Sequence, residues 1–547
     1  MVWFGRPAAA LTRLRKQVRP ALAAVAAIGI LAQTAACTPD PSSPADAEAT
    51  ALADAPTATP TDGAPLDNPQ APGGQAPLEL PADIPAEFAQ WYEQVISWET
   101  CDGTWLCATV AAPLSWADPE AGEIVLALKM QPATDTKIGT LLTNPGGPGG
   151  SGIDFIGSAY GSMGAPVRQH FDVLGFDPRG VGASTPVRCF DDAEKDYFLS
   201  VDFPDGEAGR EAVKAANAAW GEACAENTGP LFGNIDTQSA ARDMDLIRHL
   251  VGDPVLNYLG FSYGTLLGAT YAGLFPNRVG RLVLDGAIDI TLSFDESSLG
   301  QAIGFENAMR AYVADCQSGA NCPLTGTVDD GMAQIGALFE QAYQNPLPTG
   351  STRRLTRTLA TYGVVIALYD DAAWPLLTQA LRLAIEQGNG QLLLFLADFY
   401  NDRNEDGTFS TNSTEAFIGV TCLDDRGTID PAEMDRNNEV LLHAAPTVGF
   451  FFRDGGLSCW DWPYPVVERV FDIHAPGTPP ILVIGTTGDP ATPYEQAIAL
   501  ANTLEGGVLL TYVGEGHVAY LRSNACIMDT VDAFLVAGEV PPAGKEC

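Results

Sequence analysis

The sequence predicts an α/β protein in which a mostly parallel sheet has helices on both faces and a helical cap is inserted into the sheet domain. From about residue 123 onward, short apolar runs alternate with helix-like stretches, which favours parallel strands buried on both faces. The alternation stops after Asp289, and helical periodicity takes its place until strand-like residues return near Ile481. A helical insertion between two parts of one sheet domain produces such an interruption.

Length, composition and charge exclude several classes of protein. The chain has 547 residues, of which 46% are hydrophobic, so it is neither disordered throughout nor a membrane protein with many spans. It carries 29 Lys and Arg against 68 Asp and Glu, a formal net charge of −39. Nucleic-acid binding needs a basic surface that displaces counterions, so we expect no nucleic-acid partner.

The first 36 residues have the pattern of a secretory signal. Residues 1–20 contain five basic residues and no acidic one, and an apolar run from Ala21 to Ala36 follows. This run is shorter than the roughly 20 residues that span a bilayer. Cys37 directly follows small residues and resembles the lipidated cysteine of a lipobox, although Thr34 stands where leucine is usual. An ordinary cleaved signal with a spare cysteine is the alternative.

We therefore expect an exported protein whose lipid on Cys37 is its only attachment to a membrane. The expected location is the outer face of the cytoplasmic membrane, to which the lipid anchors the protein, or outside the cell if the protein is secreted. Residues 37–81 are expected to form a disordered tether, because they contain almost no large apolar side chains to bury. The folded part is then predicted to comprise residues 82–289 as the first part of the α/β core, 290–420 as the helical cap, and 421–547 as the C-terminal part of the core.

The cysteine count favours disulfides over metal binding. Of 11 cysteines, ten remain when Cys37 is set aside, and an even number in an exported chain indicates five disulfides. Connectivity does not follow from sequence, but pairing of nearest neighbours is the simplest expectation. It gives Cys101–Cys107, Cys189–Cys224, Cys316–Cys322, Cys422–Cys459 and Cys526–Cys547. Zinc is a poor alternative because no C-x-x-C pair exists.

Seven apolar runs are predicted to form strands of the sheet. They are Ile124–Leu128, Thr140–Thr143, Val173–Phe176, Val255–Leu259, Arg281–Leu284, Ile481–Ile484 and Val508–Tyr512. The fourth run continues into Gly260-Phe261-Ser262-Tyr263-Gly264, and a predicted helix follows. A G-x-S-x-G motif between a strand and a helix is typical of a nucleophilic serine on a sharp turn. Ser262 is therefore the candidate nucleophile; a glycine-rich turn with an incidental serine is the alternative.

We choose the candidate general base, and the carboxylate that orients it, by their positions directly after predicted strands. His517 follows the strand Val508–Tyr512, at the end of a parallel sheet where loops carry ligands. The other four histidines, His170, His249, His443 and His474, lie in a helix or before a strand. Asp489 follows the strand that begins at Ile481, whereas the weaker candidates Asp454 and Asp461 follow no strand-like run. The order Ser262, Asp489, His517 is that of the α/β-hydrolases.

A glycine-rich segment is the candidate oxyanion hole. Residues Asn144–Gly152 follow the strand Thr140–Thr143 and contain five glycines. Glycines let backbone N–H groups approach a developing oxyanion, and the expected donors are the N–H groups of Gly147 and Tyr263. A phosphate-binding loop is the alternative, but no lysine follows the glycines as that motif requires.

Taken together, these motifs resemble a known enzyme family. Asn144–Gly152, Phe176–Ser184, Gly260–Thr265, Gly485–Pro493 and Gly516-His517 are similar to the secreted tripeptidyl aminopeptidases of actinobacteria, which are related to the proline iminopeptidases and to a mycobacterial envelope serine-protease lipoprotein. The resemblance covers roughly residues 90–547. It implies an α/β-hydrolase fold with a helical cap, Ser262, Asp489 and His517 as the catalytic triad, no cofactor, and peptides with a free N-terminus as substrates.

The resemblance leaves the substrate open. Such aminopeptidases bind the substrate α-ammonium with carboxylates near the cap, and Asp424 and Asp425 are candidates by position, with a structural role as the alternative. An esterase, an endopeptidase or a non-catalytic binding lipoprotein remain further alternatives. The segment from Asp402 to Gly407 resembles the start of a calcium loop, but Ser413 stands where a bidentate glutamate is needed, so we expect no metal.

Overall fold

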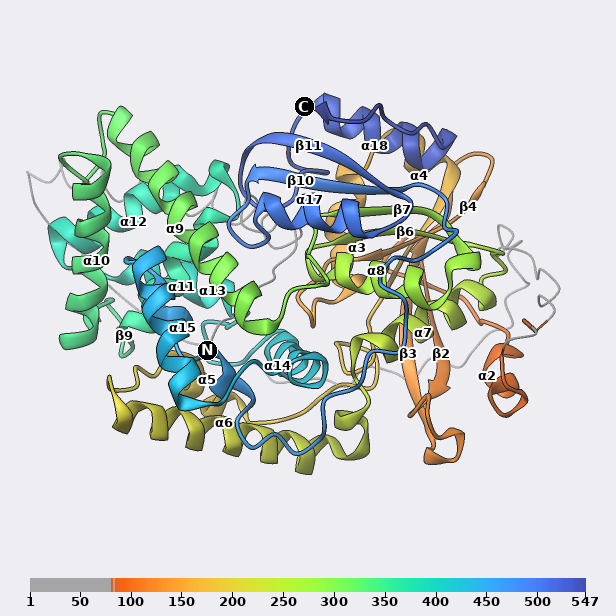
Figure 1. The fold of residues 1–547 in the computed structure, drawn as a ribbon, viewed down its shortest axis with the longest axis horizontal. Coiled ribbons are helices and arrows are strands. Elements are labelled where there is room, and N and C mark those ends of the chain that lie inside the picture. The colour runs from red at the N-terminus through yellow and green to blue at the C-terminus, as the bar shows by residue number, and fades with distance from the viewer. Residues whose placement is uncertain (1–79, 82–83) are drawn as a thin grey trace, which may run out of the picture. The chain divides into compact units, whose positions relative to one another are not determined.

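The computed structural model describes residues 80–81 and 84–547. The predicted signal, Cys37 and nearly all of the predicted tether lie outside the described residues. A ten-stranded sheet runs through the described part in the order β1-β2-β3-β5-β4-β6-β7-β10-β11-β12 (Figure 1). Its strands are β1 Glu99–Cys101, β2 Trp105–Pro113, β3 Glu123–Gln131, β4 Gly139–Asn144, β5 Phe171–Phe176, β6 Leu256–Phe261, β7 Val279–Asp285, β10 Ile481–Gly488, β11 Gly507–Glu515 and β12 Lys545–Glu546.

The directions of these strands confirm the predicted mostly parallel sheet. Neighbouring strands from β5 through β4, β6, β7, β10 and β11 to β12 are parallel, while β3 runs antiparallel to β5 and pairs with β2 in an antiparallel ladder. All seven predicted strands are present, as β3, β4, β5, β6, β7, β10 and β11. Three short or half-exposed strands, β1, β2 and β12, were not predicted. In β2, small residues and partly exposed positions give no clear alternation.

Helices cover both faces of the sheet, which explains the continuous apolar runs. Adjacent residues of a strand point to opposite faces, so Leu141 and Leu142 of β4 belong to different hydrophobic clusters. Helices α3 (Gly152–Ala159), α4 (Ala165–His170) and α18 (Ala525–Ala537) pack in one cluster. Helices α7 (Thr237–Leu250), α8 (Tyr263–Leu274) and α17 (Tyr494–Thr503) pack in the other. Strands central to the sheet are therefore buried on both sides.

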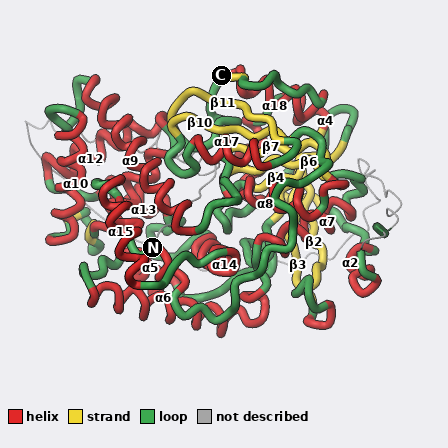
Figure 2. The backbone as a smooth tube through the Cα atoms, in the orientation of Figure 1, coloured by secondary structure: helices red, strands yellow, loops and turns green. Residues whose placement is uncertain are grey.

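The helical insertion between β7 and β10 is longer than predicted (Figure 2). It contains α9 Phe294–Ser318, α10 Val328–Gln344, α11 Arg357–Leu368, α12 Trp374–Gln387, α13 Gln391–Tyr400, α14 Ser413–Asp424, α15 Pro431–Ala444, α16 Gly449–Phe452 and η7 Gly455–Cys459, with a small β8–β9 hairpin (Leu347–Pro348, Arg354–Leu355). The expected boundary at residue 420 falls inside α14, and helices continue to Cys459. The sequence does not reveal this, because α15 is mostly polar and buries only Met434, Asn438 and Leu441, so its apolar periodicity is weak.

A second helical segment joins this insertion from the first half of the chain. Helices α5 (Asp192–Ser200) and α6 (Glu207–Thr228) follow β5. Arg210 of α6 forms an ion pair with Asp454 at 3.0 Å, and the Asn217 amide donates to the carbonyl of Leu457 at 2.7 Å. Helix α6 was not predicted because alanine, glycine and charged residues dominate it and give a weak apolar stripe.

The five expected disulfides are confirmed. They are Cys101–Cys107, Cys189–Cys224, Cys316–Cys322, Cys422–Cys459 and Cys526–Cys547.

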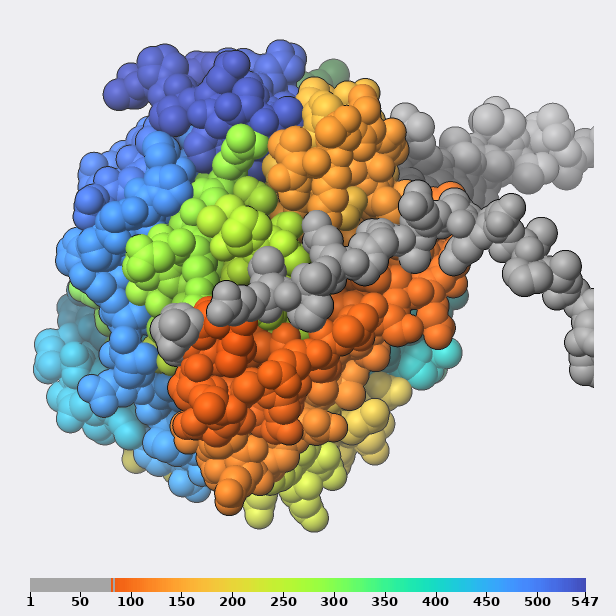
Figure 3. Space-filling view, turned by 90° about the vertical axis from the view of Figure 1, so that its right-hand side faces the viewer, coloured from red at the N-terminus to blue at the C-terminus, as the bar shows by residue number. Residues whose placement is uncertain are grey.

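Within residues 80–81 and 84–547, no helix has the length and apolarity needed to cross a membrane. On the face shown in Figure 3, residues from the start of the described part (orange) border residues from the middle of the chain (yellow-green), and the C-terminal residues (dark blue) lie at the top.

Candidate active site

Ser262 lies on a sharp turn between β6 and α8. Its backbone has φ 55° and ψ −124°, a strained region that residues other than glycine rarely adopt. The turn is held because the Ser262 N–H donates to the carbonyl of Asp285 at 2.9 Å, while the Thr265 N–H and hydroxyl donate to the Ser262 carbonyl. The surrounding hydrogen bonds therefore fix the serine at the end of β6, where it is 4% exposed.

Two glycines of the motif are required by close backbone contacts. A Cβ atom on Gly260 would lie 2.4 Å from the carbonyl oxygen of Gly264, and one on Gly264 would lie 2.8 Å from the carbonyl oxygen of Asn144. Both distances are far below van der Waals contact. The G-x-S-x-G spacing thus reflects how tightly the turn packs on itself and on the end of β4.

His517 and Asp489 form a buried pair beside this turn. Asp489 follows β10 and His517 follows β11, and His517 Nδ1 lies 2.8 and 2.9 Å from the two carboxylate oxygens of Asp489. Asp489 is oriented by backbone N–H groups of Ala491, Thr492 and Val518. This hydrogen bond favours the tautomer in which Nδ1 carries the proton, which leaves Nε2 as the basic nitrogen.

The end of β7 brings the serine and the histidine together. The carbonyl of Asp285 accepts from Ser262, and its carboxylate accepts from the N–H groups of Ala519 and Tyr520, just after the histidine. A Cβ atom on Gly286 would lie 3.1 Å from His517 Cε1. His517 Nε2 is buried and has no hydrogen-bond partner among the described residues. Catalytic hydrogen bonds are often open without substrate, so Nε2 is available to Ser262 when substrate binds.

The glycine-rich loop after β4 lies against the serine turn. A Cβ atom on Gly146 would be 2.9 Å from Ser262 Cβ and 3.1 Å from the backbone nitrogen of Tyr263. The loop is folded by the Gly146 N–H, which donates to Asn144 Oδ1 at 2.9 Å, and by the Gly150 N–H, which donates to the Gly146 carbonyl. Gly147 and Tyr263, the predicted oxyanion donors, therefore lie next to one another beside Ser262.

An arginine that sequence reasoning missed links the histidine loop to the cap. Arg522 donates to the carbonyls of Glu515 at 2.7 Å and Val518 at 3.0 Å, on either side of His517. It also lies 3.5 Å from Asp370 and 3.2 Å from Asp371, just beyond α11. No sequence pattern indicates this contact, since an arginine five residues after a histidine is not a characteristic motif.

Arg522→Ala is expected to lower kcat about 10- to 100-fold with little change in KM, because the loop that positions His517 loses its ionic links to Asp370 and Asp371 and keeps the bond of the His517 N–H to the Tyr369 carbonyl. Steady-state kinetics on a peptidyl anilide measures this, and Arg522→Lys should recover part of kcat. Arg310 pairs with Asp329 on the exposed side of the cap, so Arg310→Ala is the matched control. Equal losses in both variants would mean that Arg522 acts only through global stability.

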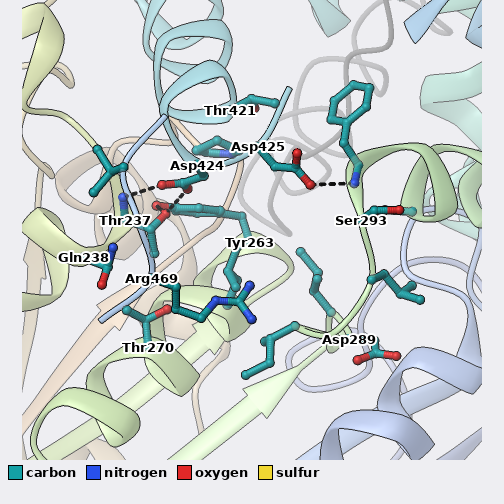
Figure 4. A pocket seen from close by; sticks show the side chains of 18 of the residues that line it. Thr237, Gln238, Tyr263, Thr270, Asp289, Ser293, Thr421, Asp424, Asp425 and Arg469 are labelled. Atoms are coloured by element: carbon teal, nitrogen blue, oxygen red, sulfur yellow. Dashed lines mark hydrogen bonds between the residues drawn. The ribbon is translucent and has the colours of Figure 1, made fainter. Parts of the chain in front are cut away.

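A cavity of about 260 Å³ adjoins the oxyanion loop, the glycine-rich segment Asn144–Gly152 named after its predicted role (Figure 4). Gly147, Pro148 and Tyr263 line it beside the serine turn. Helix α14 contributes Phe417, Thr421 and Asp424, which have the i, i+4, i+7 spacing of one helix face. The cavity thus extends from the loop near Ser262 along two turns of α14.

The two predicted amine-binding carboxylates both line this cavity but differ in their contacts. Asp424 is partly buried and accepts from the N–H of Thr237 at 3.0 Å and from its hydroxyl at 2.5 Å. Burial, together with the nearby Asp236 carboxylate, raises the pKa of Asp424 to about 7. Asp425 is exposed and accepts from the N–H of Phe294 at the start of α9. Asp424 is therefore the better candidate for binding the substrate ammonium, because Asp425 already caps the first turn of α9.

The weaker candidates have other partners. Asp454 accepts from Arg210 and Asn438. His170 lies 2.9 Å from the Thr136 carbonyl, and His474 pairs with exposed Asp472. In the calcium-like segment, Asp402 accepts from Thr411 and Arg403 pairs with Asp196, so a polar turn accounts for these residues. Within the described part of the chain, no group of three or more His, Cys, Asp or Glu side chains could hold a metal.

A mostly parallel sheet with a strained serine directly after β6, the third strand of its parallel region, defines a serine hydrolase of the α/β-hydrolase fold. Residues 139–328 match the family model described as "alpha/beta hydrolase fold". Residues 445–547 match the model described as "TAP-like protein". The chain belongs to the tripeptidyl aminopeptidase-like family of these serine peptidases, as its relatives also show.

Three relatives illustrate the range of the family. The "Serine protease Hip1" of Mycobacterium tuberculosis is 35% identical over 478 residues, which cover 83% of this chain and 91% of the relative. "Carboxylesterase B" of the same species is 34% identical over 450 residues, covering 81% and 86%. The "Tripeptidyl aminopeptidase" of Streptomyces coelicolor is 31% identical over 492 residues, covering 83% and 86%.

Proposed function

We propose that this enzyme releases tripeptides from the free N-termini of peptides. In this mechanism Ser262 Oγ attacks the scissile carbonyl while His517 Nε2 takes its proton, and Asp489 stabilises the imidazolium that forms. The oxyanion forms beside the N–H groups of Gly147 and Tyr263. His517 then gives the proton to the departing amine, and the acyl-enzyme carries the N-terminal fragment until water releases it.

The length of the cavity carries this proposal. Helix α14 forms one wall of the cavity and contacts the oxyanion loop at Phe417: a Cβ atom on Gly149 would lie 3.1 Å from the backbone nitrogen of Phe417. Asp424 follows Phe417 by seven residues, which is about 10 Å along a helix at roughly 1.5 Å per residue. An extended peptide advances about 3.3 Å per residue, so this distance matches about three residues between scissile carbonyl and ammonium.

The test is a panel of anilides with one to four residues, each with a free or an acetylated N-terminus. We expect the free tripeptidyl anilide to have the highest kcat/KM and acetylation to lower it about 100-fold. A highest rate for a free prolyl anilide would support a prolyl aminopeptidase instead. Equal rates for free and acetylated substrates would reject an aminopeptidase and favour an endopeptidase or an esterase, and the relative named carboxylesterase makes the esterase the second candidate.

Asp424→Asn is expected to raise KM for free tripeptidyl anilides about 10- to 100-fold, because the ammonium loses its ionic partner. The pKa of Asp424 is raised to about 7, so in the unchanged enzyme the carboxylate becomes protonated and neutral as the pH falls below 7. KM should therefore rise toward acidic pH in the unchanged enzyme and lose most of this dependence in the variant. Kinetics between about pH 5 and pH 8 measures both effects.

The control for this prediction is the neighbouring carboxylate. Asp425 accepts backbone N–H groups of Phe294 and Arg426, and Asp425→Asn should raise KM less. An Asp424→Asn variant with unchanged KM and an unchanged pH profile would remove Asp424 from the binding site.

Export and lipid attachment at Cys37 belong to the same proposal. The five disulfides support an oxidising compartment, because cytosolic thiols are kept reduced. Growth with radiolabelled palmitate tests the anchor: label should enter the full chain and be absent from Cys37→Ala. Label in both chains would place the lipid elsewhere, and label in neither would favour an ordinary cleaved signal.

A further inference from the structure

We propose that Arg469 makes the cavity selective for peptides that carry an acidic side chain among the residues released. This inference rests on the proposed function in that the cavity must receive the acyl part of the substrate. Arg469 lies in the segment between η7 and β10 and lines the cavity together with Tyr263 and Asp424. Figure 4 shows its guanidinium directed into the cavity next to Tyr263 and away from Thr270.

Arg469 is the one cationic side chain among the described residues that line the cavity. Each of the three carboxylates there accepts a hydrogen bond from the protein: Asp289 from Thr291, Asp424 from Thr237 and Asp425 from Phe294. Arg469 instead has no hydrogen bond or ion pair with a described residue, and its guanidinium carbon lies 5.7 Å from the ring centre of Phe471. Its five N–H donors therefore remain available to a ligand.

Hydrogen bonds hold the backbone before and after Arg469, so the fold sets the direction in which its side chain leaves the main chain. Gln238 of α7 is 7% exposed, and its amide donates to the carbonyl of Glu468 at 2.9 Å. The same amide accepts from the N–H of Val470 at 3.0 Å. The Val467 N–H donates to the carbonyl of Leu423, one residue before Asp424. These contacts reduce the ordering that ligand binding requires, because only the side chain of Arg469 must adopt one conformation.

A guanidinium in this position selects carboxylates, to which it donates two parallel hydrogen bonds. Asp289, Asp424 and Asp425 weaken the binding of an anion, so the preference of Arg469 for an acidic side chain is smaller when the ligand carries no positive charge. A peptide that brings its ammonium to Asp424 offsets this effect, and its acidic side chain can then pair with Arg469. The cavity is thus complementary to a short segment with a positive N-terminus and one negative side chain.

The experiment compares tripeptidyl anilides based on Ala-Ala-Ala in which Glu, Gln or Lys replaces each alanine in turn. For the unchanged enzyme we expect kcat/KM with Glu to exceed that with Gln about tenfold at one of the three positions. Arg469→Gln should bring this ratio close to one, and Arg469→Glu should instead favour Lys at the same position. Arg469→Lys should retain part of the preference for Glu.

The control variant removes one positive charge away from the cavity. Arg436 is exposed on α15, and Arg436→Gln should leave the ratio of Glu to Gln unchanged. A ratio near one at all three positions of the unchanged enzyme, or a ratio that survives in Arg469→Gln, would overturn the proposal.

A second substrate series separates this proposal from the aminopeptidase function. Nitrophenyl esters with an acyl chain that ends in a carboxylate are compared with esters whose chain ends in a methyl group. If free peptides are poor substrates but the acidic ester is preferred through Arg469, the proposed peptidase function fails and the role of Arg469 stands. If peptides are cleaved and neither series depends on Arg469, the peptidase function stands and the role of Arg469 fails.

Discussion

Ser262→Ala is expected to lower kcat at least about 10⁴-fold and to abolish labelling by a fluorophosphonate probe, because the attacking oxygen is lost. The proposed oxyanion donors, the N–H groups of Gly147 and Tyr263, remain, so a small residual rate above the uncatalysed reaction is expected. Hydrolysis of the free tripeptidyl anilide and gel-based probe labelling measure the two effects.

This variant should fold normally. Alanine at φ 55° is strained as serine is, and the hydrogen bonds that hold the turn are made by the backbone of residue 262 and by Thr265. Ser158 on α3 donates within its own helix and is remote from the turn in sequence, so Ser158→Ala serves as the matched control for thermal unfolding and activity. A folded Ser262→Ala enzyme that still hydrolyses anilides or takes up the probe would disprove the nucleophile.

The positions of the three candidate catalytic residues were predictable because each follows an apolar strand. Parallel strands place their carboxyl ends at one edge of the sheet, so Ser262 after β6, Asp489 after β10 and His517 after β11 must meet there. The strands themselves are buried on both faces and form continuous apolar runs, which makes them visible without knowledge of the fold. The structure confirms the pairing of Asp489 with His517 at 2.8 Å.

What the sequence did not reveal depends on contacts between distant segments. Arg522 meets Asp371 of the cap, and Gln238 fixes the backbone around Arg469, yet neither pair is linked by a periodic pattern. The role of α14 was missed for a related reason. Its boundary with the core was placed at residue 420 from composition, whereas the helix is continuous to Asp424 and joins the oxyanion loop to the candidate amine site.

The acid of the triad has one close structural rival, which Asp489→Asn distinguishes. Asp285 is a fully buried carboxylate beside the same histidine loop, and burial raises its pKa to about 7. However, its oxygens accept from the N–H groups of Ala519 and Tyr520, whereas His517 Nδ1 lies against Asp489. Asp285 therefore positions the loop, and of these two carboxylates only Asp489 is placed to set the tautomer of the histidine.

Asp489→Asn is accordingly expected to lower kcat about 10⁴-fold at neutral pH with little change in KM. An asparagine can donate to His517 Nδ1, which favours the tautomer with the proton on Nε2 and leaves no base for Ser262. The asparagine NH₂ group also faces backbone N–H groups that donate to the carboxylate in the unchanged enzyme, so the free energy of unfolding should fall by about 1–3 kcal/mol.

Asp285→Asn is the matched control. Its NH₂ group would likewise face two backbone N–H donors, so the variant should lose similar stability, yet kcat should fall far less because the pairing of His517 with Asp489 is kept. If the two variants lost equal activity, the acid would not be assigned to Asp489; a selective loss in Asp489→Asn at matched stability assigns it there.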